Sequence, residues 1–187
     1  VTFSEGEPPE SLAALRAGDC DIAVAFAYDG MDVSKFDDEL DVFVARKLLE
    51  DEVRLVLPAD HALAEQVCVT MADVSTEQWI AGCPRCRGHL MSISHAAGFE
   101  PNVAFETEDY VAVLGLVSEG LGVAIVPELI LRTAHHPNVA TPRLHPTPKR
   151  TIYAVTTQDL QRVPAVKATL DALTSSAQLM AALPAPS

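Results

Sequence analysis

Hydrophobic and polar residues alternate along the chain with a spacing that switches repeatedly between that of a strand and that of a helix. Glu7-Pro-Pro-Glu10 predicts a helix start, because the first helical turn tolerates proline and favours carboxylates, and Gly18 predicts its end. The nearly all-apolar run at residues 21–26 then predicts a buried strand. Similar short runs predict further strands at residues 42–44, 53–57, 79–81, 103–105, 122–127, 139–144 and 151–155.

Helical spacing fills several of the segments between these strands. Further helices are predicted at residues 87–97, 107–120, 127–131 and 163–183, and Thr107 is the predicted cap of the second. A loop at residues 27–39 carries Gly30 and five acidic residues, Asp29, Asp32, Asp37, Asp38 and Glu39. Strands that alternate with helices predict an α/β protein with mostly parallel sheets and a ligand cleft at the carboxyl ends of the strands.

The length and composition are typical of a folded protein. A chain of 187 residues can form one domain or two small lobes, and 49% of its residues are hydrophobic. Its apolar runs are far shorter than the roughly 20 residues of a membrane span, and the start at residues 1–7 is acidic, unlike a secretory leader. Because the chain does not begin with Met, we expect a fragment or a processed product.

The negative charge is concentrated in the first third of the chain. The net charge is −13, and residues 1–60 alone hold 15 acidic against 5 basic side chains. Binding to nucleic acid needs Lys and Arg on one face, but here they are scattered apart from Arg85/Arg87 and Lys149-Arg150. This chain by itself is therefore expected to bind DNA poorly, and its acidity is expected to keep it in solution.

Two of the four cysteines carry a chemical signal. Cys20 and Cys68 are interpreted as small core residues, because each lies in or beside an apolar stretch. The cysteine count is too low for a disulfide-stabilised scaffold, so a reducing cytoplasm is expected. Cys83-Pro-Arg-Cys86 lies between a predicted strand and a predicted helix, where the helix N-terminus and nearby arginines lower the pKa of a thiol. Three interpretations stay open: thiols that line the cleft wall, a redox pair, or half of a metal site. The metal site is the weakest, because zinc needs four ligands and there is no second Cys-x-x-Cys.

Four motifs, in order, resemble the effector-binding half of LysR-type transcriptional regulators. They are Glu10-Ser-Leu-Ala-Ala-Leu-Arg-Ala-Gly-Asp-Cys-Asp-Ile-Ala-Val24, Leu55-Val-Leu-Pro-Ala-Asp-His-Ala-Leu63, Gly98-Phe-Glu-Pro101 and Leu116-Val-Ser-Glu-Gly-Leu-Gly-Val-Ala-Ile-Val-Pro127. The likeness covers residues 1–173. It implies an α/β fold of two Rossmann-like lobes joined by two crossing strands, with a ligand cleft between the lobes, as in type II periplasmic binding proteins.

The resemblance also implies domain boundaries. The first lobe is expected at residues 1–52 and 149–187, and the second at residues 53–148. The family's DNA-reading helix-turn-helix is absent from this chain, as are the first strand and helix of the first lobe, and Val1-Thr-Phe3 resembles the second strand. We therefore expect the chain to be part of a longer regulator.

The same resemblance points to ligand-binding residues. The segment matching Gly82, Pro84, Arg85 and Cys86 faces the effector in the family, and Arg85 beside a helix N-terminus suits an anion. The matching positions of the first lobe are Glu7, which could pair with an amine or serve only as a first-turn charge, and Phe26. Thr107 is expected to lie by the cleft.

No catalytic constellation is found. Ser92 and Ser94 lack the Gly-x-Ser-x-Gly elbow of a hydrolase, no Gly-x-Gly-x-x-Gly is present, and no cofactor or metal is expected. The predicted function is effector sensing in a cytoplasmic regulator that forms a homodimer or homotetramer through residues 10–16 and 42–46. It would reach promoter DNA only through the absent N-terminal domain, without membrane contact. The alternatives are a redox-sensing regulator acting through Cys83/Cys86, a transporter's solute-binding protein and a cytosolic enzyme.

Overall fold

The computed structural model of the protein describes residues 1–29 and 43–182. The chain divides into two compact units. The terminal unit comprises Val1–Asp51 and Lys149–Ala185, and the central unit comprises Glu52–Pro148. The chain passes from one unit to the other at these two junctions.

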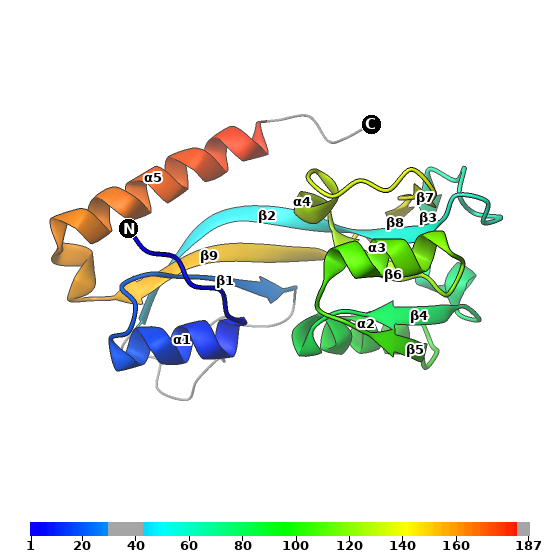
Figure 1. The fold of residues 1–187 in the computed structure, drawn as a ribbon, viewed down its shortest axis with the longest axis horizontal. Coiled ribbons are helices and arrows are strands. Elements are labelled where there is room, and N and C mark those ends of the chain that lie inside the picture. Colours follow the sequence, from blue (N-terminus) through cyan, green and yellow to red (C-terminus); the bar gives the residue numbers. More distant parts are fainter. Residues whose placement is uncertain (30–42, 183–187) are drawn as a thin grey trace. The chain divides into compact units, whose positions relative to one another are not determined.

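A small sheet forms the middle of the terminal unit (Figure 1). Strand β1 (Ala23–Tyr28) pairs antiparallel with β9 (Lys149–Thr157), so that Ala23 lies opposite Val155 and Tyr28 opposite Arg150. On its other side β9 neighbours the long strand β2 (Phe43–Pro58). The predicted strands at 42–44 and 53–57 are thus one continuous strand in the described residues, while Val42 lies outside them.

Helices α1 (Pro8–Ala17) and α5 (Pro164–Ala181) cover opposite faces of this sheet (Figure 1). Successive strand residues point to opposite faces. Accordingly, Val155 packs with Leu12 and Leu15 of α1, and its neighbour Ala154 packs with residues of α5. Helix α1 begins with proline and ends at Gly18, whose φ of 80° is the left-handed conformation that glycine adopts without strain.

The central unit is built around the second half of β2. This strand pairs antiparallel with three short strands, β6 (Ala124–Pro127), β7 (Val139–Ala140) and β8 (Arg143–Leu144). Strand β3 (Cys68–Val69) runs parallel to β8, and β4 (Gln78–Ala81) runs parallel to β5 (Asn102–Glu106). Four helical segments complete the unit: η2 (Met71–Val74), α2 (Pro84–Ala96), α3 (Tyr110–Ser118) and α4 (Glu128–Leu131).

The prediction of mostly parallel sheets is wrong for the described strands around β1 and β2. A parallel pair needs a crossover that returns the chain to the same end of the sheet, commonly a helix. Strands β4 and β5 have such a crossover in α2, whereas β1 pairs with β9 and β2 with β6 in the antiparallel sense. Counting alternating strands and helices does not reveal which strands become neighbours.

Several predicted boundaries also shift. The segment at residues 1–3 is an exposed coil rather than a strand, because no described strand pairs with its backbone. The predicted strand at 139–144 divides into β7 and β8 around Pro142, which has no N–H to donate to a neighbouring strand. Helix α2 begins at Pro84 rather than at residue 87. In the predicted loop at 27–39, Gly30, Asp32, Asp37, Asp38 and Glu39 lie outside the described residues.

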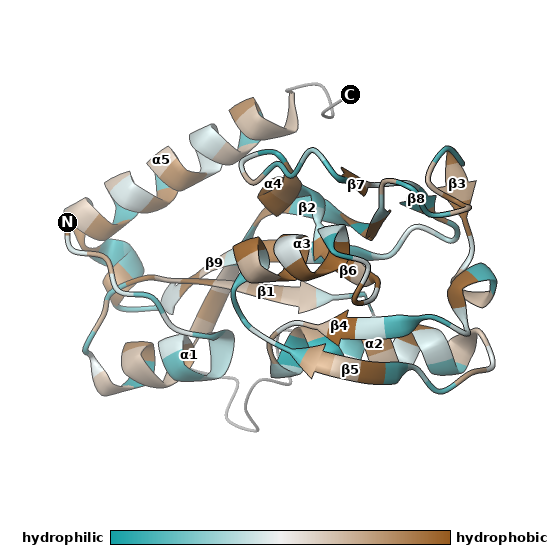
Figure 2. Cartoon of the chain, turned by 45° about the vertical axis from the view of Figure 1, so that its right-hand side comes forward, coloured by the Kyte–Doolittle hydropathy of each residue, from teal (hydrophilic) through white to brown (hydrophobic). Residues whose placement is uncertain are grey.

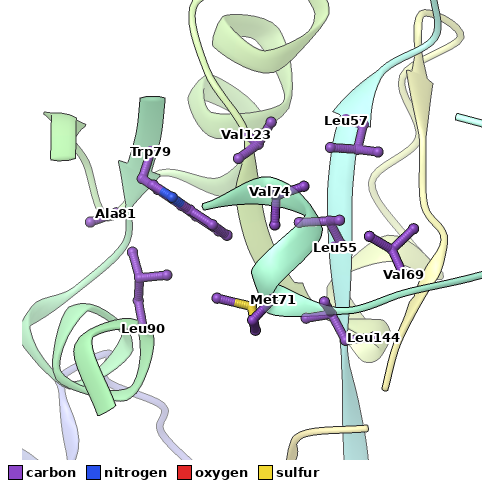
Figure 3. Close-up of a cluster of buried hydrophobic side chains, with 10 residues drawn as sticks. All are labelled: Leu55, Leu57, Val69, Met71, Val74, Trp79, Ala81, Leu90, Val123 and Leu144. Atoms are coloured by element: carbon purple, nitrogen blue, oxygen red, sulfur yellow. The ribbon is translucent and has the colours of Figure 1, made fainter. Parts of the chain in front are cut away.

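Trp79 lies at the middle of the main core of the central unit. Its side chain is fully buried, and Figure 3 shows its ring among Met71, Val74 and Leu90, which come from η2 and α2. A second cluster joins Val113, Leu114 and Val117 of α3 to β6, and hydrophobic colours dominate α3 in Figure 2. The two clusters hold α2 and α3 on β4 and β6.

Each unit also contains a buried ion pair on a crossing strand. In the central unit, Arg54 of β2 donates from Nε and Nη2 to Glu128 Oε2 over 3.0 and 2.9 Å, and both residues are at most 9% exposed. In the terminal unit, Arg150 Nε donates to Asp51 Oδ2 over 2.9 Å. A buried charge that loses its partner is costly, so these pairs favour one arrangement of the strands that carry them.

We expect Leu90→Ala to lower the free energy of unfolding by about 2–5 kcal/mol, since it leaves a cavity beside Trp79. Urea denaturation followed by tryptophan fluorescence measures the change. Ser92→Ala on the exposed face of the same helix is the control and should change the value by less than about 0.5 kcal/mol. Equal effects of the two substitutions would contradict this packing of α2.

We expect Glu128→Ala to lower the free energy of unfolding by about 3–5 kcal/mol, because it leaves the Arg54 guanidinium buried without the Glu128 carboxylate. The double variant Arg54→Met/Glu128→Leu should recover most of the loss, because it removes both charges. Lys47→Ala is the control: it breaks an exposed ion pair with Glu50 and should lower the free energy of unfolding by less than about 1 kcal/mol. Urea unfolding compares the three variants. A double variant as unstable as Glu128→Ala would show that the unpaired Arg54 charge is not the cause of the loss.

Candidate functional site

The carboxyl ends of β4 and β5 meet at the N-terminus of α2 in the central unit. The backbone N–H of Thr107, just after β5, donates to the carbonyl oxygen of Ala81, the last residue of β4, over 3.1 Å. Cys83 caps α2 and Pro84 is its first residue. The first N–H groups of a helix have no partner within it and lie at the positive end of its dipole. This edge of the unit therefore favours a negatively charged group.

Gly82 allows the first turn of α2 to lie close to the end of β4. A Cβ atom at this position would lie 3.0 Å from Cys86 Cβ and 3.5 Å from its Sγ. Any larger residue would require Cys86 to shift by a few tenths of an ångström, since the first distance is shorter than about nine in ten real Cβ contacts. Gly82 and Cys86, both predicted ligand-binding residues, are thus in contact.

The two thiols of the Cys-Pro-Arg-Cys motif face each other. Cys83 Sγ and Cys86 Sγ are 2.9 Å apart, each residue is 6% exposed, and neither is in a disulfide. Cys86 Sγ also lies 3.6 Å from the hydroxyl of Tyr110, the first residue of α3. Tyr110 was not among the predicted site residues. Its position beside the end of β5 was the available signal.

The two arginines of this segment differ in their surroundings. Arg87 is exposed, and its Nε donates to Glu106 Oε1 at the end of β5 over 2.8 Å. Arg85 is half-buried in the first turn of α2. An arginine in a first helical turn can place its planar guanidinium against a carboxylate, so Arg85 is the better candidate for contact with an anion.

The capping prediction for Thr107 is wrong. Asp109 caps α3, because its Oδ1 accepts hydrogen bonds from the N–H groups of Val111 (2.8 Å) and Ala112 (3.4 Å). Thr107 Oγ1 instead accepts from Asp109 N–H over 3.3 Å. Aspartate is preferred over threonine at this position, and its charge complements the helix dipole. Thr107 is thereby placed beside the end of β4, where its role toward a ligand stays a prediction.

Glu7 and Phe26, the other predicted ligand-binding residues, belong to the terminal unit. Glu7 caps α1 with its backbone, and its Oε2 is buried without a hydrogen bond to any described residue. The Phe26 ring carries the Arg150 guanidinium 4.9 Å above its centre and meets Tyr28 edge to face. These contacts account for the packing of Phe26, and a ligand contact of either residue stays a prediction.

His89, one helical turn after Cys86, is a buried histidine. Burial lowers the pKa of His89 to about 4, so the side chain is neutral near pH 7. Within residues 1–29 and 43–182, no three Cys, His, Asp or Glu side chains converge as a metal site. In the same part of the chain, no helix has both the length and the hydrophobicity to cross a membrane.

This arrangement of parallel strand ends and a helix N-terminus is typical of an α/β ligand-binding domain. The chain belongs to the LysR substrate binding domain family, whose sequence model matches residues 1–178. Among curated proteins, the chain is similar to the transcriptional dual regulator GltC of Bacillus subtilis, with 29% identity over 157 residues, 82% of this chain and 49% of GltC. It is also 26% identical to the dual regulator OxyR of Escherichia coli K12 over 79% of this chain and 47% of OxyR.

The chain therefore spans about half the length of these two relatives. Among solved structures, it is similar to the C-terminal domain of a probable LysR family regulator from Rhodococcus sp. RHA1, with a TM-score of 0.75, 22% identity and coverage of 92% of this chain and 83% of that one. It is also similar to the effector binding domain of QuiR in complex with shikimate, with a TM-score of 0.76, 21% identity and coverage of 95% and 81%. These structures confirm the predicted fold class.

The lowered pKa of His89 predicts that acid destabilises the protein. The unfolded chain binds a proton on this residue below about pH 6.5 and the folded chain only below about 4, so stability falls as the pH drops through this range. The contribution is up to about 3 kcal/mol. His89→Gln should remove this part of the pH dependence and His95→Gln, exposed on the same helix, should not. Urea unfolding between pH 7 and pH 4 measures the pH dependence of the free energy of unfolding. The same pH dependence in wild type and in His89→Gln would refute this assignment to His89.

Proposed function

We propose that this chain senses a small carboxylate held at the N-terminus of α2 in the central unit. The observation that carries the proposal is the meeting of the β4 and β5 carboxyl ends with a helix start that carries Arg85. The positive end of the helix dipole and a guanidinium both stabilise an anion. Gly82, Pro84, Cys86 and Thr107 would line the same place.

The proposal extends to the terminal unit and to the whole regulator. Glu7 and Phe26 of the terminal unit are proposed as further effector contacts, on the family resemblance alone. An effector that binds one arrangement of the lobes more tightly than another shifts their equilibrium, and this difference in affinity is sufficient for signalling. The role is sensing rather than catalysis.

The response would reach promoter DNA through a helix-turn-helix part of the full-length regulator, in the cytoplasm. Two features support this extension: the family match over residues 1–178 and the similarity to regulators about twice as long. A homodimer or homotetramer is proposed as the acting form, with contacts along residues 10–16 and the strand at 42–46, of which Val42 lies outside the described residues.

A carboxylate panel that includes shikimate, citrate and glutamate tests the site by thermal shift and calorimetry. For a carboxylate that binds, Arg85→Ala should weaken the affinity by roughly 10- to 150-fold, because a hydrogen bond to a charged group contributes about 1.5–3 kcal/mol. Arg87→Ala is the matched control and should leave Kd within about twofold, since Arg87 pairs with Glu106.

Two results would count against this function. If carboxylates bind equally well to wild type and Arg85→Ala, the effector lies elsewhere in the domain. If neither carboxylates nor a broader panel of amines and neutral metabolites raises the melting temperature, effector sensing by this chain is wrong.

A further inference from the structure

The Cys83–Cys86 pair is a cluster of two nucleophilic thiols whose sulfur chemistry effector binding does not require. A disulfide requires two cysteines whose side chains can approach within bonding distance, and the two sulfur atoms are already in contact at 2.9 Å. The motif places one thiol at the cap of α2 and the other in its first turn, where the helix dipole favours a thiolate. Cys20 and Cys68 lie elsewhere in the sequence and provide internal comparisons.

We propose that Cys83 and Cys86 form a reversible disulfide when the protein meets a hydroperoxide. The thiolate of Cys86 attacks one peroxide oxygen, the O–O bond breaks, and the leaving oxygen takes a proton as an alcohol or as water. The Cys83 sulfur then attacks the resulting sulfenic acid of Cys86, the S–S bond forms, and the hydroxyl leaves as water with the proton of the Cys83 thiol. The two thiols lose two electrons together, and the peroxide gains them.

Three observations bear on this assignment of roles. The Tyr110 hydroxyl, 3.6 Å from Cys86 Sγ, can donate a hydrogen bond to the thiolate and to the sulfenic acid. Gly82 leaves room for the first turn of α2 to bring Cys86 toward Cys83. Each cysteine is only 6% exposed, which hinders access by a bulky disulfide protein.

The disulfide would also alter the proposed effector site, since Cys86 and its neighbour Arg85 belong to it. This consequence rests on the proposed function, whereas formation of the disulfide does not. The experiment therefore measures the bond itself, without any effector.

The test treats the full chain with hydrogen peroxide, blocks remaining thiols with iodoacetamide and digests it with trypsin. Cleavage after Arg85 separates the two cysteines, so a Cys83–Cys86 disulfide leaves the Cys86-Arg87 dipeptide attached to the peptide that ends at Arg85. We expect this linked pair after peroxide and its complete loss after dithiothreitol. Cys83→Ser should abolish the link and leave Cys86 as a sulfenic acid that dimedone labels. Cys68→Ser, at an exposed cysteine, should retain the link.

Three outcomes would overturn the proposal. They are full alkylation of both cysteines after peroxide, direct formation of sulfinic acid without the link, and a link from Cys86 to Cys68 that is lost in Cys68→Ser. Circular dichroism and urea midpoints close to wild type confirm that each serine variant is folded, so that a missing link reports chemistry rather than unfolding.

Discussion

The backbone of strand β2 is the constraint on which the rest of the structure depends. Its 16 residues, Phe43–Pro58, contribute to both units, and every buried N–H and C=O along it needs a partner. In the central unit the partners come from β6, β7 and β8, and all five residues from Val53 to Leu57 are buried. Arg54 on the same strand pairs with Glu128, the first residue of α4, and this pair ties α4 to β2.

The candidate site follows from the packing that this strand supports. Trp79 and Leu90 bury one side of β4 and α2 together, and Gly82 lets the chain turn sharply between them. The helix N-terminus, Arg85 and the two thiols are consequently presented at one edge of the central unit. An anion would bind there through the guanidinium and the backbone N–H groups. An oxidant would react at the same edge with the sulfur atoms.

Much of this edge was predictable from local sequence. The Cys-Pro-Arg-Cys motif after an apolar run predicted thiols and an arginine near a helix start, because glycine, proline and helix starts are local signals. Tyr110 was not predicted for the site, and Asp109 rather than the predicted Thr107 caps α3. A hydroxyl that reaches a thiol across two helices and the better of two caps both depend on tertiary contacts. The position of Glu106 beside Arg87 depends on the pairing of β4 with β5, which is likewise non-local.

By itself, the sequence determined the α/β class, most helices and strands, the ends of α1 at proline and Gly18, and the family through four ordered motifs. These features depend on residues close together in the chain, where side-chain spacing and backbone preference act directly. Only the tertiary structure decided that β1 and β2 have antiparallel neighbours, that two predicted strands are one, and that Arg54 and Arg150 are buried against Glu128 and Asp51. These strand pairings and ion pairs join residues 68 or more positions apart in the sequence, which no local pattern records.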